Sequence, residues 1–371
     1  MRGNNVVGII FSNMHDDALR EVTSIRTFGS VPFGGRYRTI DFPLSNMVNS
    51  GVNKVGVITK SNYQSLMDHL GSGKAWDLSR KREGLFILPP FGNGNSMYNN
   101  RIEALDGISN FLKNCNEEYV ILADCDMICN LDFKKVLDAH LDNNADITVV
   151  YRHGEMPASL TESVVLELNG QGKVTDIVAG VNKEGKCDWG MGIYVMRNDF
   201  LQKIISDAIS RNRNNFVRDI LQRGVLENKI YGYKFEGYVS AIDCMQSYFN
   251  ANMDLMSIDV LKDLFNPMRP IYTKVRDEMP AKYGLGSSVK NSIIADGCVI
   301  EGEVENCVLF RGVHVGKGAK ISNCIVMQDT TIGDNTVLDY VVSDKDVVFG
   351  DGKTMIGTDS YPMYVAKGSK V

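Results

Sequence analysis

Two patterns of hydrophobic and polar residues divide the chain. Up to about residue 260, short apolar runs rich in β-branched residues alternate with longer helical stretches. The runs lie at 6–11, 53–60, 119–123 and 146–151, and the clearest helical stretches lie at 62–70 and 133–143. Such short runs are typical of strands, and strands that are apolar throughout predict a doubly wound, mostly parallel α/β sheet. Ligands bind such sheets beyond the carboxyl ends of the strands, so candidate chemistry belongs there.

After about residue 285 the apolar positions follow a different rule. Leu309, Val315, Ile321 and Met327 follow one another at a spacing of six, with glycine, asparagine, aspartate and other small residues between them. A six-residue repeat of branched residues indicates a β-helix, in which several short coils stack to bury one core. A β-sandwich has no reason to keep a step of six. We therefore predict an α/β domain at 1–260, a linker at 261–284 and a β-helix domain at 285–371.

Composition excludes several classes of protein. The 371 residues carry 40 basic and 45 acidic side chains, a net charge of −5, without a long basic run, which argues against a nucleic-acid partner. No stretch approaches the roughly 18 apolar residues that span a bilayer, so no membrane association is expected. The eight cysteines lack metal-binding spacing and are read as reduced thiols of a cytoplasmic protein.

One glycine-rich segment is a candidate phosphate site. Gly34 and Gly35 would let the backbone approach a ligand closely, and Arg36 and Arg38 could address a phosphate. A tight turn before the helix expected at 40–49 explains the same residues equally well.

Two carboxylates follow an apolar strand at the edge where chemistry is expected. Asp124 and Asp126 close the run at 119–123, where an α/β enzyme would hold a hydrated magnesium ion. A turn or a helix cap is an equally good explanation. The five histidines form no recognisable pattern with serine, cysteine or aspartate, so a hydrolytic triad is not predicted.

A long segment, 31–59, closely resembles the signature region of bacterial glucose-1-phosphate adenylyltransferases, also called ADP-glucose pyrophosphorylases. The likeness covers nearly the whole chain, because 118–133, 189–201 and 248–255 also match, as does the hexad region. The resemblance implies a nucleotidyltransferase-like sheet followed by a left-handed parallel β-helix. It also implies adenylyl transfer from ATP to glucose 1-phosphate with magnesium, in which metal and basic groups stabilise the developing charge.

The chain departs from this family where the triphosphate should bind. The family's glycine-rich loop GGGxGTRL is replaced by 11–17, which carries two acidic residues and no glycine. At about 1 kcal/mol per unit-charge pair at 4 Å in bulk water, such a loop repels ATP. Asp126 matches the catalytic aspartate of the family, but we expect it to be vestigial.

Four further family positions are changed. Phe28 stands where the family has a lysine, and Ala241 stands at the second metal-binding aspartate, with Asp243 two residues out of place. The lysine that holds the sugar phosphate has no counterpart at 178–181, and 100–104 replaces the nucleotide-binding GTADA segment. Each such loss removes several kcal/mol of transition-state stabilisation, so the isolated chain is predicted to be inactive or very weak.

What remains resembles the non-catalytic second subunit found beside the catalytic one in some Gram-positive bacteria. The resemblance implies a hetero-oligomer, expected to be a tetramer, in which this regulatory subunit activates a catalytic homologue for glycogen synthesis. No metal or cofactor is expected in this chain, and Mg²⁺ is expected in the catalytic partner. Arg26, Gly34, Gly35, Arg36 and Arg38 are candidates for binding a sugar-phosphate effector, with structural ion pairing as the alternative for the arginines.

Three other functions remain open from the sequence. An active sugar-phosphate nucleotidyltransferase with a divergent loop is favoured by Asp126 and opposed by the loop at 11–17. An acyltransferase would need a histidine on the β-helix, where His314 is the candidate. A homomeric sensor without a partner enzyme is the third.

Overall fold

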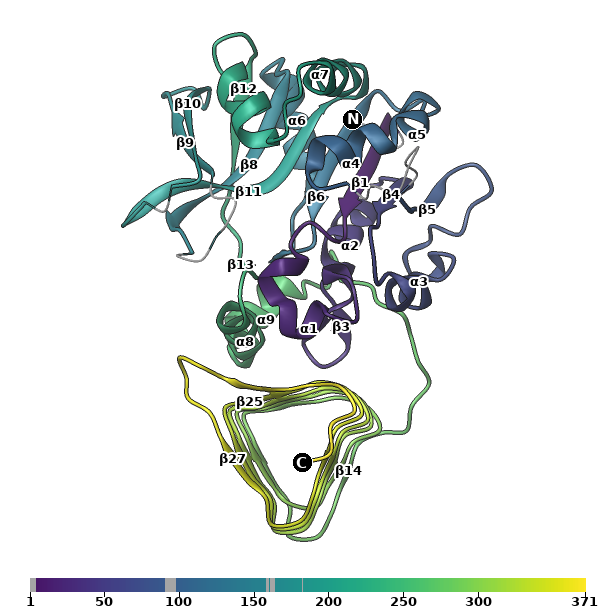
Figure 1. Ribbon diagram of the computed structural model, residues 1–371, viewed down its shortest axis with the longest axis vertical. Helices are drawn as coiled ribbons and strands as arrows, with labels where there is room; N and C mark the ends of the chain where they lie inside the picture. Colours follow the sequence, from purple (N-terminus) through teal and green to yellow (C-terminus); the bar gives the residue numbers. More distant parts are fainter. Residues whose placement is uncertain (1–4, 91–97, 158–159, 161–163, 182) are drawn as a thin grey trace.

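The computed structural model describes residues 5–90, 98–157, 160, 164–181 and 183–371. Within these ranges the first part of the chain is built on a nine-stranded sheet, drawn in the upper half of Figure 1. Its strands are β1 (Val6–Phe11), β4 (Lys54–Ile58), β5 (Gly84–Leu88), β6 (Tyr119–Asp124), β8 (Ile147–Glu155), β9 (Val164–Leu168), β10 (Val174–Ala179), β11 (Lys186–Arg197) and β12 (Ile230–Phe235).

The sheet runs in the order β10-β9-β11-β6-β1-β4-β5, and β8 and β12 continue from β11. Strands β6, β1, β4 and β5 are parallel, whereas β11 pairs antiparallel with β6, β8 and β9. The strands predicted at 6–11, 53–60, 119–123 and 146–151 are confirmed as β1, β4, β6 and β8. The predicted nucleotidyltransferase-like α/β fold is confirmed as well.

Helices cover both faces of this sheet. On one face α4, α5 and α7 share a hydrophobic core with the sheet, and on the other face α2, α3 and α6 do so. The helices are α1 (Arg20–Thr23), α2 (Asp41–Asn49), α3 (Gln64–Leu70), α4 (Arg101–Gly107), α5 (Ser109–Lys113), α6 (Phe133–Asp142), α7 (Asn198–Ser210), α8 (Met245–Met253) and α9 (Ile258–Leu264). Two small ribbons lie outside the main sheet: β2 (Pro32–Phe33) with β3 (Tyr37–Arg38), and β7 (Met127–Cys129) with β13 (Val239–Ala241).

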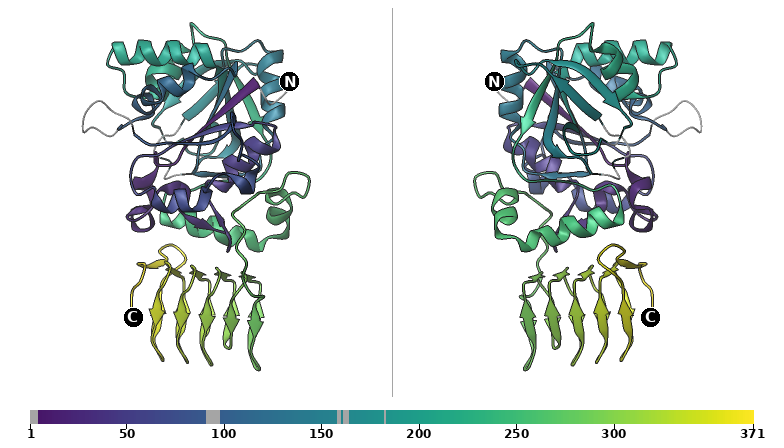
Figure 2. Two further views of the ribbon diagram at one scale, coloured as in Figure 1. Left: turned by 90° about the vertical axis from the view of Figure 1, so that its right-hand side faces the viewer. Right: turned by 90° about the vertical axis from the view of Figure 1, so that its left-hand side faces the viewer.

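The hexad region folds as the predicted left-handed parallel β-helix. The coils stack side by side in Figure 2, with the first and last coils at opposite ends. Leu309, Val315 and Ile321 are at most 2% exposed and belong to the core between the three sheets. Met327, the next position at the predicted step of six, is also buried but packs outward against the α/β part, and Val326 takes the inward place in that coil. The strands of the three sheets are β14 (Lys282–Tyr283), β17 (Val299–Ile300), β20 (His314–Val315), β23 (Thr331–Ile332) and β26 (Val348–Phe349); β15 (Ser288–Lys290), β18 (Glu303–Glu305), β21 (Lys320–Ser322), β24 (Val337–Asp339) and β27 (Thr354–Ile356); and β16 (Ile293–Ile294), β19 (Val308–Leu309), β22 (Ile325–Val326), β25 (Val341–Ser343) and β28 (Met363–Val365).

The β-helix packs against the α/β part through one of its three sides. In Figure 1 the side that carries β25 faces α1, β3 and α8. Buried side chains of the β-helix, including Phe310 and Met327, belong to the same hydrophobic cluster as those of α2 and α8. The two parts therefore share a core. No helix in the described ranges is long and apolar enough to cross a membrane.

Candidate functional site

Two aspartates meet the loop that follows β1. Strands β1 and β6 are parallel neighbours in register, so that Phe11 at the end of β1 lies opposite Asp124 at the end of β6. Asp126 follows two residues later, and the two aspartates are only 3% and 5% exposed. Buried carboxylates need compensating charge or hydrogen bonds, because desolvation penalises the ionised form.

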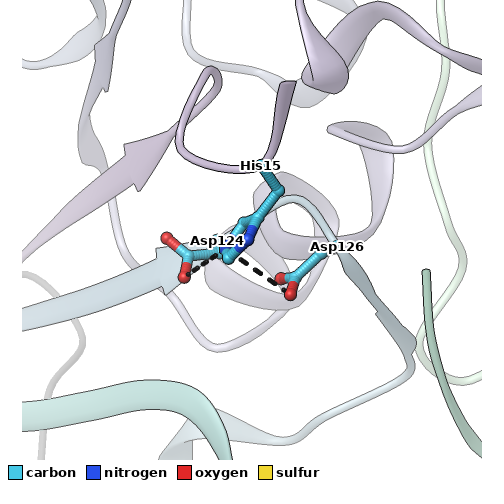
Figure 3. Close-up of side chains that lie close together, drawn as sticks. All are labelled: His15, Asp124 and Asp126. Carbon is cyan, nitrogen blue, oxygen red and sulfur yellow. Dashed lines mark hydrogen bonds and ion pairs between the residues drawn. The ribbon is translucent and has the colours of Figure 1, made fainter. Parts of the chain in front are cut away.

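A histidine from the loop after β1 supplies part of that compensation. His15 Nε2 lies 3.2 Å from Asp124 Oδ2 and 3.5 Å from Asp126 Oδ2, so the ring sits between the two carboxylates (Figure 3). The pairing joins residues 109 positions apart. No spacing rule reveals it, and the histidines were not expected to contact acids. The signal that could have found it is that both segments leave neighbouring parallel strands at the same edge of the sheet.

An arginine also compensates for the burial of the carboxylates. Arg101, the first residue of α4, is 4% exposed, and its Nη2 donates to Asp124 Oδ2 at 2.5 Å. Asn100 caps this helix by accepting a hydrogen bond from the backbone of Glu103, which fixes where Arg101 leaves the helix. The guanidinium is also enclosed by aromatic rings, with centroid distances of 4.7 Å to Phe11, 5.6 Å to Tyr194 and 5.7 Å to Phe216.

The electrostatics of the two aspartates diverge. Although burial opposes ionisation, the charges and hydrogen bonds of Arg101 and His15 hold the pKa of Asp124 below its usual value. Burial raises the pKa of Asp126 to about 6; the charge of His15 opposes this rise and that of Asp124 adds to it. The site thus contains one firmly ionised carboxylate bound to an arginine, beside one that titrates near neutrality.

A third carboxylate lies in the same cavity. Asp243 lines a small cavity together with Asp124, Asp126 and Arg101. Ser247 Oγ donates to Asp243 Oδ1 at 2.8 Å. Its displacement by two residues from the family position therefore does not remove Asp243 from the cavity. Ala241 itself is buried in β13, opposite Met127 of β7.

The carboxylates of this cavity retain oxygens that a cation could contact: in the described part of the chain, Asp124 Oδ1, Asp126 Oδ1 and Asp243 Oδ2 are buried and accept no hydrogen bond. Within the described residues, His15, Asp124 and Asp126 form the group whose ligand atoms lie close enough together to hold a metal ion. Mg²⁺ prefers oxygen ligands and retains several waters. Oδ2 of each aspartate of the pair, by contrast, already contacts the imidazole of His15, and Asp124 Oδ2 also accepts Arg101 Nη2.

One aspartate of the loop at 11–17, the acidic loop expected to repel ATP, forms hydrogen bonds that hold this loop in place. Asp16 Oδ1 accepts the backbone N–H of Phe28 at 2.8 Å, and Asp16 Oδ2 accepts Asn13 Nδ2 at 2.6 Å. Burial raises the pKa of Asp16 to about 6. Phe28, at the position of the family's lysine, is buried with its ring edge-on to His15 at 6.3 Å. Asp16 is therefore engaged inside the loop, whereas Asp17 is 89% exposed and pairs with Arg20, and neither carboxylate is among the residues that line the cavity beside Asp124.

A second cluster lies between the α/β part and the β-helix. Six cationic and two acidic side chains line a cavity to which the β2–β3 turn, β3, α3, the linker and the β-helix contribute. The lining residues are Arg36, Tyr37, Arg38, His69, Lys274, Arg276, Glu278, Arg311, Gln328, Asp329 and Lys345. Such an excess of positive charge in a concave site is typical of anion binding. We call this cavity the anion cavity.

The structure separates the five candidate effector residues. Arg36 and Arg38 line the anion cavity. Gly34 and Gly35 form the left-handed turn between β2 and β3, with φ of +57° and +81°; a Cβ on Gly35 would lie 3.3 Å from Ile293 of the β-helix. These glycines therefore allow the turn to approach the β-helix.

Arg26 is placed elsewhere. Its Nη2 donates to Asp344 Oδ1 at 2.8 Å, and both side chains are at most 3% exposed. This contact is a buried ion pair that joins the α/β part to the β-helix. The pair matches the structural alternative considered for the arginines.

Burial and neighbouring positive charges lower the pKa values of two arginines in the anion cavity. Burial lowers the pKa of Arg38 to about 10, opposed by Asp41 and assisted by Arg26. Burial together with Arg36 and Arg276 lowers the pKa of Arg311. Arg38 Nη1 donates to the backbone oxygen of Ser65 at 2.6 Å and to its hydroxyl at 2.8 Å, which holds the guanidinium at the cavity wall.

Comparison with known proteins agrees with this architecture. Residues 16–258 match the family model described as nucleotidyl transferase, and residues 279–362 match the model described as GlmU-like, C-terminal hexapeptide. The chain is similar to the glycogen biosynthesis protein GlgD of Bacillus subtilis (strain 168), with 36% identity covering 86% of this chain and 84% of that protein. It is similar to GlgD of Geobacillus stearothermophilus, with 38% identity over 86% and 83% of the two chains. It is also similar to the glucose-1-phosphate adenylyltransferase of Clostridium acetobutylicum, with 32% identity over 87% and 86%.

Proposed function

Because the chain belongs to the nucleotidyltransferase family, and within it to the group of GlgD and glucose-1-phosphate adenylyltransferase, we propose that it is a regulatory subunit of a glucose-1-phosphate adenylyltransferase in glycogen biosynthesis. In this proposal a catalytic homologue converts ATP and glucose 1-phosphate to ADP-glucose and pyrophosphate. The present chain binds that homologue and shifts its activity.

The contact of Arg101 and His15 with the acid pair carries the proposal. Nucleotidyl transfer from ATP requires cations that neutralise the triphosphate and the developing charge. In this chain Arg101 and His15 contact the acid pair, and the neighbouring loop lacks the glycines of the family's triphosphate loop. Both features support the proposal that the chain is catalytically impaired and binds no metal of its own.

A rival function is favoured by one observation. Asp126 and Asp243 both line the cavity at the end of β6, so two carboxylates remain near the position where the family performs its chemistry. An active nucleotidyltransferase would need Arg101 to leave Asp124 when substrate binds. The experiment below distinguishes the two functions.

Assembly with a catalytic homologue provides the regulation. If this chain binds the active conformation of its partner better than the inactive one, assembly raises activity by the ratio of those affinities. The first coil of the β-helix supports assembly there, because Met279, Tyr283 and Leu285 are 79%, 53% and 106% exposed. We propose a heterotetramer in the cytoplasm, where the free thiols of the eight cysteines would persist.

The anion cavity supports the effector in this proposal. A sugar phosphate offers the charge that the six cations lack, and the guanidinium groups of Arg36 and Arg38 match phosphate oxygens geometrically. Because residues of both parts of the chain line the cavity, a bound effector contacts the α/β part and the β-helix together. Effector binding can therefore change the contact between the α/β part and the β-helix.

The test is an assay of pyrophosphate release with magnesium, ATP and glucose 1-phosphate. The chain alone, the catalytic homologue from the same organism alone and their mixture are compared. We expect no measurable turnover by the chain alone and a changed kcat or KM in the mixture. Asp126→Asn in this chain tests its chemistry directly, with Asp142→Asn as a matched exposed control on α6. Both variants should leave the mixed enzyme's rate unaltered. Magnesium-dependent turnover by the chain alone, abolished by Asp126→Asn, establishes the rival.

A further inference from the structure

Lys345 occupies an unusual place in the anion cavity. It lies in the turn between β25 and β26 and lines the cavity between the β-helix and the α/β part. Its side chain is half-buried and lines the cavity opposite the arginines of β3 and the linker. A buried lysine is normally paired with a carboxylate, because an isolated ammonium loses its hydration.

The neighbouring carboxylate, Asp344, already accepts hydrogen bonds from other groups. Asp344 Oδ1 accepts hydrogen bonds from Arg26 Nη2 at 2.8 Å and from the backbone N–H of Lys345 at 2.7 Å. Asp344 Oδ2 accepts the Tyr364 hydroxyl at 2.8 Å. In the part of the chain that the structure describes, no carboxylate lies within 4.0 Å of the Lys345 ammonium.

The charges around Lys345 are mostly of its own sign. Arg38 faces it from β3, Arg26 from the segment after α1, and Lys367 from the C-terminal tail. Two acids lie near it. Asp344, in the same turn, raises the pKa of Lys345, and the charge of Lys345 lowers the pKa of Asp329 across the cavity. Burial, with Arg38 and Arg26, lowers the pKa of Lys345 to about 7. At neutral pH roughly half of the molecules therefore carry a neutral amine at this position.

We propose that the anion cavity binds its ligand together with one proton, which is taken up from water by the Lys345 amine. The proposal rests on the effector site of the proposed function and adds the charge and pH dependence of its ligand. The neutral amine, one proton and a dianion combine to give an ammonium paired with the dianion, so that charge and atoms balance. The ligand class is an anion with at least two charges, because a single charge would be outweighed by the surrounding cations.

The direction of the pH dependence follows from this coupling. The bound anion raises the pKa of Lys345, so binding takes up a proton between the pKa of the free state and that of the bound state. If only the protonated form binds, the competent fraction falls from about nine tenths at pH 6 to about one tenth at pH 8, given a pKa of about 7. Affinity should therefore weaken about tenfold over this range.

Two other side chains of the cavity have shifted pKa values in the acidic range. His69 Nε2 is held by Asp41 Oδ1 at 2.6 Å, and burial lowers the pKa of His69 below its ordinary value of 6.5. Burial, with Asp346 and Glu278, raises the pKa of Asp329 above its ordinary value of 3.8. A change in affinity between pH 7 and pH 8 that disappears in Lys345→Arg therefore reports on the lysine.

Inorganic sulfate is a suitable probe, because it remains a dianion throughout this pH range. Calorimetry of sulfate binding to the full chain at pH 6, 7 and 8 should give a dissociation constant that rises about tenfold. Repeating the titration in two buffers of different ionisation enthalpy measures the proton uptake. Lys345→Arg keeps a permanent cation and should bind sulfate with little change between pH 6 and 8. Lys345→Met should bind weakly at every pH.

A matched control and three outcomes make the test decisive. Lys320→Arg alters an exposed lysine of the β-helix, paired with Glu303, and should titrate like the wild type. Sulfate binding that is independent of pH, or a pH dependence that survives in Lys345→Arg, overturns the proton coupling and leaves the effector site standing. Unchanged binding in Lys345→Met overturns it too, because the anion then binds elsewhere. Absence of any sulfate binding overturns both this inference and the effector part of the proposed function.

Discussion

Replacing Arg101 by methionine tests whether the arginine balances the acid pair. Asp124 is 3% exposed, and among the residues that the structure describes its remaining ion-pair partner after removal of the arginine is His15, at 3.2 Å. Methionine keeps the apolar stem against Phe11 but removes the guanidinium. The variant therefore tests the loss of the positive charge separately from the loss of apolar packing.

The expected loss is several kcal/mol. A pair of unit charges about 4 Å apart interacts by about 4 kcal/mol at an effective dielectric constant of 20. Loss of the contacts with three aromatic rings adds about 1 kcal/mol. His15 remains near Asp124 and recovers part of this energy. We expect Arg101→Met to lower the free energy of unfolding by about 3–4 kcal/mol, within the usual range for an orphaned buried charge.

Tryptophan fluorescence during urea unfolding measures this change in the right part of the molecule. The chain has two tryptophans, and both Trp76 and Trp189 are buried in the α/β part. The double variant Arg101→Met/Asp124→Asn removes both charges and should return to within about 1 kcal/mol of the wild type, because a buried ion pair contributes little against neutral side chains. An Arg101→Met variant within 0.5 kcal/mol of the wild type would refute the charge assignment, as would a double variant less stable than the single one.

Three further predictions follow from the same geometry. The folded-state pKa of Asp126, about 6, lies above its ordinary 3.8, so its contribution to stability is present at low pH and lost as the pH rises through 6. Asp126→Asn should accordingly raise the free energy of unfolding at pH 8 by about 1–3 kcal/mol and flatten its dependence between pH 4 and 8, as followed by urea titration at each pH. Arg26→Met leaves Asp344 buried beside Tyr364 and should lower the free energy of unfolding by about 3 kcal/mol, with Arg26→Met/Asp344→Asn restoring most of it. Magnesium at 5 mM should leave the free energy of unfolding of the wild type unchanged. An increase above roughly 1 kcal/mol would show that the acid pair binds the ion.

The elements were predictable because each is encoded by local periodicity. The run at 6–11 became β1 with the same bounds, and the step of six from Leu309 to Met327 indicated the β-helix before any contact was known. The edge of the sheet that carries Asp124 and Asp126 followed from the rule for parallel strands. These features depend on residues that are close together in the chain.

The partners of the acid pair were not predictable in the same way. His15 and Asp124 are 109 residues apart, and Arg101 reaches Asp124 from the first turn of a helix on the far side of an undescribed segment. Their meeting depends on the register of β1 with β6 and on the rotamer of one long side chain. Alignment with a family motif also misplaced the third acid, because Asp243 reaches the cavity from two residues beyond the expected position. Position in an alignment constrains the backbone more than it constrains where a carboxylate points.

Charge balance argues for different roles of the two clusters. At the end of β6, the ionised Asp124 has its own arginine, and His15 lies against both carboxylates. The anion cavity has six cations against two acids, and burial, with neighbouring positive charges, lowers the pKa values of Arg38, Arg311 and Lys345. Packing like charges together costs stability unless a counter-charge arrives. This difference in charge between the two clusters supports the proposal that the anion cavity, rather than the acid pair, takes an anionic ligand.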